Sequence, residues 1–154
     1  MFSKGFTLLE VLIVVVVAVV VTMFAVPSYK KSQDRGRYMA ASGVLMELGN
    51  AAVMVQEQYP DKTWGDTSVT ANSAATVCPD PNDSFALMDA LQGCKFLNKI
   101  AFSNGKFMGY TYQVNPSASV SCLSCSGIAC MSGDNLNTQY TCAAVDKMGN
   151  LTHN

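Results

Sequence analysis

One apolar run near the N-terminus constrains this chain more than any other feature. The run covers Leu8–Val26, nineteen positions of which fourteen are Leu, Ile, Phe or Val, and only Glu10 and Thr22 interrupt it. Nineteen helical residues span roughly 28 Å, close to the thickness of a bilayer's hydrocarbon core. The apolar side chains outweigh one acidic residue near the end, so the run is predicted to insert into a membrane.

Valine-rich sequence also suits a buried strand, which is the main structural alternative for this run. Strands usually end after about 4–8 residues. A lone strand in lipid would leave its backbone N–H and C=O groups unpaired, whereas a helix pairs them within the segment. We therefore predict a membrane-spanning helix.

Glu10 is the one charged residue of the run. A carboxylate in hydrocarbon is costly unless it is paired, which makes Glu10 a functional candidate. The alternative is that Glu10 only marks the start of the helix, where the helix dipole favours an acid.

The residues that precede the run favour the functional interpretation. The segment Lys4–Glu10 reads Lys-Gly-Phe-Thr-Leu-Leu-Glu and, with Pro27 just beyond the apolar run, resembles the processing site of type IV pilins and pseudopilins. The resemblance is specific over roughly residues 1–30 and rests on architecture alone beyond residue 60. It implies cleavage between Gly5 and Phe6 by a prepilin peptidase and N-methylation of the new Phe6 amine. It also implies that Glu10 sets the register of each new subunit relative to the N-terminal amine of its neighbour.

Electrostatics agrees with that role for Glu10. A charged Phe6 amine would lie in the same lipid or subunit core as Glu10, and pairing would neutralise two charges that are each expensive alone. Removing one partner of a buried ion pair typically costs about 3–5 kcal/mol. Because the two residues are four apart on one helix, a pair within one chain is also possible, and the sequence leaves both open.

Two other kinds of N-terminal segment compete with this interpretation. A secretory signal peptide would have a shorter apolar core and an Ala-x-Ala-like cleavage site, which Met23–Pro27 does not provide. A plain single-span anchor is the other competitor. The positive-inside rule favours the opposite orientation to the one the resemblance implies. One flank carries Lys4, and the other carries Lys30, Lys31, Arg35 and Arg37.

The chain is predicted to comprise a leader (1–5), a membrane or filament-core helix (6–27), an amphipathic continuation (28–60) and a disulfide-rich β domain (61–154). Pro27 removes a backbone donor, so a kink or local melting near Met23–Val26 is expected. The continuation ends at Tyr59-Pro60-Asp61.

An apolar stripe at helical spacing defines the face of the continuation that should pack on the domain. The stripe consists of Ala41, Val44, Leu45, Leu48, Ala51, Ala52, Val55 and Tyr59. The glycines weaken the helix but permit close helix–helix approach; they are Gly36, Gly43 and Gly49. Three methionines are interpreted as ordinary gap-fillers of the core: Met39, Met46 and Met54.

The remainder of the chain changes from loop to strand patterns. Residues 61–84 are interpreted as a surface loop, and Ser84–Leu91 as a short helix capped by Asp83 or Ser84. Three to five antiparallel strands are expected to pack on the helix stripe. They are predicted within Phe107–Val114, Ser119–Cys122 and Tyr140–Val145, while Leu151–Asn154 is either a short final strand or a loose end. The fold class is therefore α+β.

The six cysteines all lie beyond the apolar run: Cys78, Cys94, Cys122, Cys125, Cys130 and Cys142. An even count in a domain outside the cytoplasm indicates three disulfides, with fifteen possible connectivities. Cys78–Cys94 is a plausible pair because it closes a loop around the short helix. The alternative, a metal or redox site at Cys122-x-x-Cys125, lacks a second close pair of ligands.

Other chemistry has little support in the sequence. The formal charge is −1 and charged residues make up 14% of the chain, so a nucleic-acid partner is not indicated. The only histidine, His153, is next to last, which leaves no catalytic pair. Asp134–Asn137 offers oxygen ligands for calcium but lacks the EF-hand pattern. We predict no enzyme activity, cofactor or assigned metal.

The resemblance implies a structural pilin that forms a homopolymeric filament through its N-terminal helices. Its expected partners are further copies of the chain, a prepilin peptidase, the assembly machinery and, before assembly, the inner membrane. The expected final location is an extracellular filament supporting adhesion, motility or uptake. The alternatives are a type II secretion pseudopilin in a periplasmic pseudopilus, a minor pilin, and a membrane-anchored binding domain that never polymerises.

Overall fold

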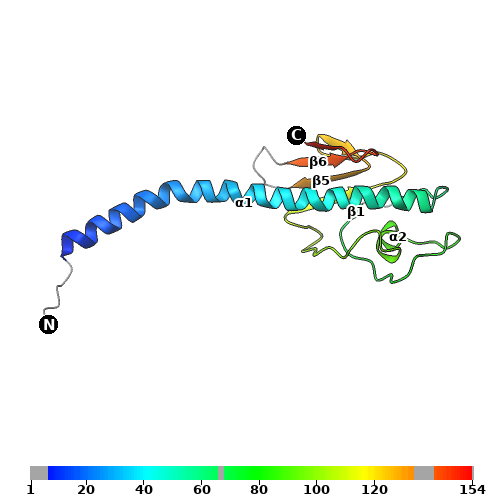
Figure 1. Ribbon diagram of the computed structural model, residues 1–154, viewed down its shortest axis with the longest axis horizontal. Coiled ribbons are helices and arrows are strands. Elements are labelled where there is room, and N and C mark those ends of the chain that lie inside the picture. The colour runs from blue at the N-terminus through cyan, green and yellow to red at the C-terminus, as the bar shows by residue number, and fades with distance from the viewer. Residues whose placement is uncertain (1–6, 66–67, 134–140, 154) are drawn as a thin grey trace. The chain divides into compact units, whose positions relative to one another are not determined.

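The computed structural model describes residues 7–65, 68–133 and 141–153, and the chain divides into two units, 1–35 and 36–154. Helix α1 (Leu8–Gln58) passes through both units. The second unit adds one helix, α2, and a set of short strands (Figure 1). These elements are β1 (Ser68–Val69), α2 (Leu87–Gly93), β2 (Tyr110–Val114), β3 (Val120–Cys122), β4 (Cys125–Gly127), β5 (Ala129–Gly133), β6 (Cys142–Val145) and β7 (Leu151–His153).

The first unit consists of the N-terminal part of α1. Thr7 caps this helix, because its hydroxyl oxygen accepts a hydrogen bond from the Glu10 backbone N–H at 3.2 Å. The helix continues through Pro27, so Met23–Val26 is helical rather than locally melted, and the expected kink stays a prediction. Proline removes one hydrogen bond of the ladder, and the long apolar helix tolerates that single loss. Figure 1 shows the blue part of α1 curved but unbroken.

In the second unit, the predicted stripe of α1 forms the centre of the hydrophobic core. Leu45, Leu48, Ala52 and Val55 are fully buried, and Tyr38 extends the buried face by one turn beyond the predicted stripe. The helix ends at Gln58, as the following Tyr59-Pro60 pair predicts. Alanine and leucine favour the helix, and their apolar side chains give it a flat face to place on a sheet.

That face packs on a five-stranded antiparallel sheet with strand order β1-β2-β5-β6-β7. Alternate residues of β2 point toward the helix, and Tyr110, Tyr112 and Val114 are buried there. The Tyr112 hydroxyl donates to the Ala41 carbonyl of α1 at 3.3 Å. In Figure 1 the cyan to green part of α1 runs along β5 and β6, and α2 lies on the other side of that helix.

The opposite face of the sheet is covered by the hairpin formed by β3 and β4. Its cysteines join a second buried cluster with side chains of β5 and β6. The backbone of β4 comes very close to β6, because a Cβ at Gly127 would lie 2.2 Å from the Val145 carbonyl oxygen. The second unit therefore has three layers, with the central strands sandwiched between α1 and this hairpin. The α+β class is confirmed.

Several strand predictions need correction. The patterns correctly located β2, β3, β6 and β7, but they missed β1, β4 and β5. The sheet that packs on the helix stripe has five strands, within the expected three to five, and the described residues add two strands in the separate hairpin.

The segment from residue 61 to 84 is more than a surface loop. Trp64 and Val69 are buried in the main core. Asn72 ties the segment down, because its amide oxygen accepts hydrogen bonds from the Ile100 backbone N–H and the Gln92 side chain at 2.8 and 2.7 Å. Polar residues here form hydrogen bonds with buried groups of the protein rather than with water. Composition alone does not distinguish these two cases and therefore suggested a surface loop.

Helix α2 begins at Leu87, later than predicted, and neither Asp83 nor Ser84 caps it. Asp89 performs that role by reaching back to accept a hydrogen bond from the Ala86 backbone N–H at 3.1 Å. An acid at this position satisfies one of the free N–H groups at the helix start and favours the helix dipole.

Candidate functional site

The apolar half of α1 is the most unusual surface of the molecule. No part of its most apolar window is buried, and the helix is long and apolar enough to cross a membrane. Large side chains along it are about half exposed or more, from Val20 at 49% to Leu8 at 83%. Contiguous apolar surface of this extent marks a site of contact with lipid or with other chains.

Glu10 lies in the first turn of this helix, within the exposed apolar surface. Thr7 and Glu10 are spaced as in a capping box, and the Thr7 hydroxyl oxygen accepts a hydrogen bond from the Glu10 backbone N–H. This position fits the helix-start role, because the dipole favours an acid there. It also leaves the carboxylate at the tip of the apolar surface. Gly5 and Phe6, the predicted processing and methylation residues, lie outside the described part of the chain.

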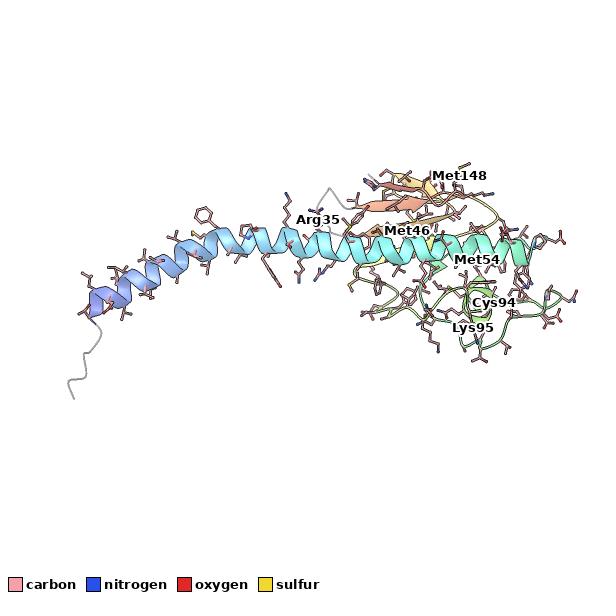
Figure 2. The ribbon with its side chains drawn as sticks, in the orientation of Figure 1. Arg35, Met46, Met54, Cys94, Lys95 and Met148 are labelled. Atoms are coloured by element: carbon pink, nitrogen blue, oxygen red, sulfur yellow. A yellow bond between two sulfur atoms is a disulfide. The ribbon has the colours of Figure 1, made fainter. Side chains whose placement is uncertain are left out.

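The outward face of α1 in the second unit carries the three methionines. Met39, Met46 and Met54 are 55, 43 and 49% exposed, so their interpretation as core gap-fillers was wrong. Figure 2 labels Met46 and Met54 on this part of the helix. Gly36 and Gly43 share this face, and a Cβ at either position would meet nothing within 4 Å.

We define Gly36, Met39, Gly43, Met46 and Met54 as the Met–Gly face. Its first four members repeat at seven-residue spacing, Gly36 with Gly43 and Met39 with Met46, which places them along one side of a helix. This spacing is the signal by which the sequence could have revealed the face. Gly49 differs, because it permits α1 to approach β6: a Cβ there would lie 2.9 Å from Val145 Cγ1.

A shallow hollow of about 330 Å³ adjoins the Met–Gly face between α1 and the turn that joins β6 to β7. Asn50 and Met54 line it from the helix, and Lys147 and Met148 line it from the turn. Met148 is 89% exposed, so it extends the exposed apolar surface beyond the helix (Figure 2).

All six cysteines are paired, which confirms the prediction of three disulfides. Cys78–Cys94, the pair considered plausible from sequence, is present. The others are Cys122–Cys130 and Cys125–Cys142. Cys122 and Cys125 lie opposite each other in the hairpin but bond to different strands, β5 and β6. Their thiols are therefore unavailable as the metal ligands that the Cys-x-x-Cys spacing had offered.

The Cys78–Cys94 disulfide lies against Tyr59, the last buried residue of the helix stripe. The Tyr59 hydroxyl donates to the Pro79 carbonyl oxygen at 2.7 Å and lies 3.2 Å from Cys78 Sγ. Burial and, to a smaller degree, the negative charge of Asp80 raise the pKa of this phenol. Tyr59 therefore stays protonated and joins the end of α1 to the disulfide loop.

The titratable side chains of the described residues are the remaining candidates for site chemistry. Within that part of the chain, no three His, Cys, Asp or Glu side chains cluster as metal ligands would. His153 belongs to β7, where it pairs with Ala143, and its side chain is exposed. The Asp134–Asn137 segment, considered for calcium, lies outside the described residues.

Comparison with known proteins did not identify a relative. No protein-family model matches the chain, and no match was found among curated proteins or solved structures. The functional argument therefore rests on the residues and geometry described above.

Proposed function

We propose that this chain is the structural subunit of a type IV pilus-like filament. In this proposal the precursor sits in the inner membrane through the apolar half of α1 and loses residues 1–5 by prepilin peptidase cleavage before Phe6. It then polymerises through its helices into an extracellular filament. The second unit forms the filament surface and determines adhesion, motility or uptake.

The observation that carries the proposal is the exposed apolar half of α1 with one carboxylate in its first turn. Fully burying a Val or Leu side chain contributes about 1.5–3 kcal/mol, so fourteen such residues represent tens of kcal/mol. The residues that the structure describes supply no cover for them. Lipid before assembly and neighbouring helices after assembly would provide that cover in turn.

Two features favour assembly over simple anchoring. Lipid is as apolar as leucine, so helices in a membrane associate through close packing and polar pairs rather than through hydrophobic burial. Glu10 supplies a polar group that would need a partner in that environment, and the neighbouring subunit's Phe6 amine has the opposite charge. The Met–Gly face extends the available contact surface, because its glycines leave room for another backbone.

The related alternatives are a type II secretion pseudopilin and a minor pilin, which share the same helix and processing. An anchored binding domain that does not polymerise is the alternative of a different class. Long surface fibres would favour a major pilin, while short periplasmic assemblies would favour a pseudopilin.

The first test is intact-mass analysis of protein from native membranes and from sheared surface material. We expect a chain that begins at methylated Phe6 in the sheared fraction, six hydrogens lighter than its reduced form. A chain that still begins at Met1 and occurs only in membranes would contradict processing and assembly, and would leave the anchored binding domain.

The second test separates assembly from anchoring with single substitutions. Glu10→Ala should abolish recovery of the chain in sheared material while leaving membrane insertion intact, and Glu10→Gln should do the same because it lacks the charge. Asp61→Asn is the matched control, since Asp61 is exposed and lies beyond the end of α1. Normal filaments from both Glu10 variants would refute the pairing role.

A further inference from the structure

No function described above uses the cations that follow the apolar run. Residues 30–37 of α1, which we call the basic segment, carry one acid and four exposed cations: Lys30, Lys31, Arg35 and Arg37. In the orientation that the pilin resemblance implies, these charges lie on the translocated flank of the span, where the positive-inside rule disfavours them. Cations kept against this rule indicate a partner of negative charge on that side of the membrane.

Two acids lie on the exposed side of α1 in the second unit. Glu47 and Glu57, which we call the acidic pair, are both exposed and are close in sequence to Met46 and Met54 of the Met–Gly face. Ion pairs within a helix form between residues three or four positions apart. Neither glutamate has a cation at that spacing, so the helix itself leaves both charges uncompensated.

The hollow beside the Met–Gly face adds to this negative surface. Glu57 lines it from α1, and Asp146 and Lys147 line it from the turn between β6 and β7. Two acids and one cation leave the described lining of the hollow with a net negative charge. Met54 adds apolar surface between these groups. Lysine and arginine suit such a surface, because their aliphatic stems cover apolar side chains while their charged ends remain at the polar edge.

The basic segment and the acidic pair cannot neutralise each other along one helix. Their closest members in sequence, Arg37 and Glu47, are ten positions apart on α1. Asp34 is the only acid within the basic segment and can offset only one of its four cations. Charges of opposite sign that are separated along one helix can pair when a second copy lies alongside, shifted along the helix axis.

We propose that the basic segment of one copy packs on the acidic pair and the Met–Gly face of a second copy. Packed helices lie about 8–10 Å apart between their axes. Gly43 leaves room for such an approach, because a Cβ there would meet nothing within 4 Å. In this contact the cationic side chains cover Met46 and Met54 and end at Glu47 and Glu57. The charges thereby determine how far neighbouring subunits are shifted along the helix axis.

This inference rests on the proposed filament and is tested by reversing the charges on each side. Glu47→Lys/Glu57→Lys and Lys30→Glu/Lys31→Glu should each lower recovery of the chain in sheared surface material about tenfold, because like charges would then face each other. The variant that combines all four substitutions should restore most of that loss. All four positions are exposed, and lysine and glutamate are both good helix formers, so the fold should be kept.

The matched controls reverse two charges at exposed positions outside the proposed contact: Asp61→Lys/Asp83→Lys and Lys95→Glu/Lys99→Glu. Neither control should reduce recovery. N-terminal peptide analysis of the membrane fraction should find every variant beginning at Phe6, which separates lost assembly from lost insertion or processing. A wild-type chain that is absent from the sheared material would contradict the proposed function and this inference together.

If the wild-type chain assembles, two results would overturn this inference alone. Unchanged recovery after either reversal would show that those charges lie outside the contact. Losses after both reversals that the combined variant does not restore would show that the two sets of charges act separately. The cations would then bind another anion, such as a phospholipid headgroup or a nucleic acid.

Discussion

The two units of this chain share one helix but rely on different surroundings. From Leu8 to Val26 the large side chains of α1 are exposed, while from Tyr38 to Tyr59 one face is buried in a core shared with a sheet and α2. Three disulfides stabilise the second unit, and none lies in the first. The same secondary structure is therefore stabilised by a buried core in one unit and exposed to its surroundings in the other.

The largest expected effect tests that contrast with one substitution in each unit. Leu48→Ala should destabilise the second unit by about 2–5 kcal/mol, because Leu48 is fully buried. Leu12→Ala, at a position that is 56% exposed, should change the same unfolding transition by less than about 0.5 kcal/mol. Urea unfolding followed by the fluorescence of Trp64, the only tryptophan, reports on the second unit. Similar losses in both variants would show that the units unfold together.

Removal of a disulfide should produce the next largest effect. The free energy of unfolding of the Cys78→Ala/Cys94→Ala double variant should fall by about 3 kcal/mol, as expected for a loop of 16 positions. The Cys122–Cys130 disulfide closes a loop of only 8 positions. The Cys122→Ala/Cys130→Ala variant should therefore lose somewhat less stability. Chemical unfolding of both variants measures the difference, and a larger loss in the second would show that packing of the hairpin outweighs loop entropy.

Two glycines of α1 should respond to the same substitution with opposite signs. Gly49→Ala should destabilise by about 1 kcal/mol, because its Cβ would lie 2.9 Å from a methyl group of the buried, β-branched Val145. Gly43→Ala meets nothing within 4 Å and should stabilise by up to about 1 kcal/mol through helix propensity. Thermal melts of the two variants test the sign, and a destabilised Gly43→Ala chain would contradict the open Met–Gly face.

The smallest expected effect concerns the turn between β6 and β7. Hydrogen bonds from the Asn150 side chain and backbone, and then from the Met148 and Gly149 backbone, lower the pKa of Asp146. Because the folded-state pKa of Asp146 is depressed, its ionised carboxylate contributes to the stability of the folded turn above its ordinary pKa near 3.8. This stabilisation is lost as the pH falls through the lower folded value. NMR titration should give that lowered value, and Asp146→Ala should flatten the acid dependence of the turn's amide shifts. An ordinary pKa would contradict this arrangement.

Periodicity and composition predicted the parts of the fold that follow local rules. The apolar run, the buried stripe and the end of α1 at Tyr59-Pro60 all follow helical spacing and proline chemistry. Strand β2 was predicted because Tyr110 and Tyr112 alternate with polar residues. The count of cysteines gave the number of disulfides, but only the fold determines which distant cysteines meet.

The missed strands show where local rules fail. Strand β5 consists of Ala129, Cys130, Met131, Ser132 and Gly133, none of them β-branched or aromatic. It lies at the centre of the sheet, between α1 and the hairpin, and its small residues allow layers to pack closely on both sides. Tertiary packing therefore selected residues for which local propensity does not predict a strand. Of the candidate site, the exposed apolar helix was predictable, but the outward Met–Gly face required knowledge of which side meets the sheet.

The disulfide pattern also has a mechanical consequence. Cys78–Cys94 and Cys125–Cys142 span 16 and 17 positions, so on the order of 110 Å of contour length cannot be drawn out when the chain is under tension. Under tension between its ends, the second unit would therefore lengthen less than an unbridged chain of the same number of residues.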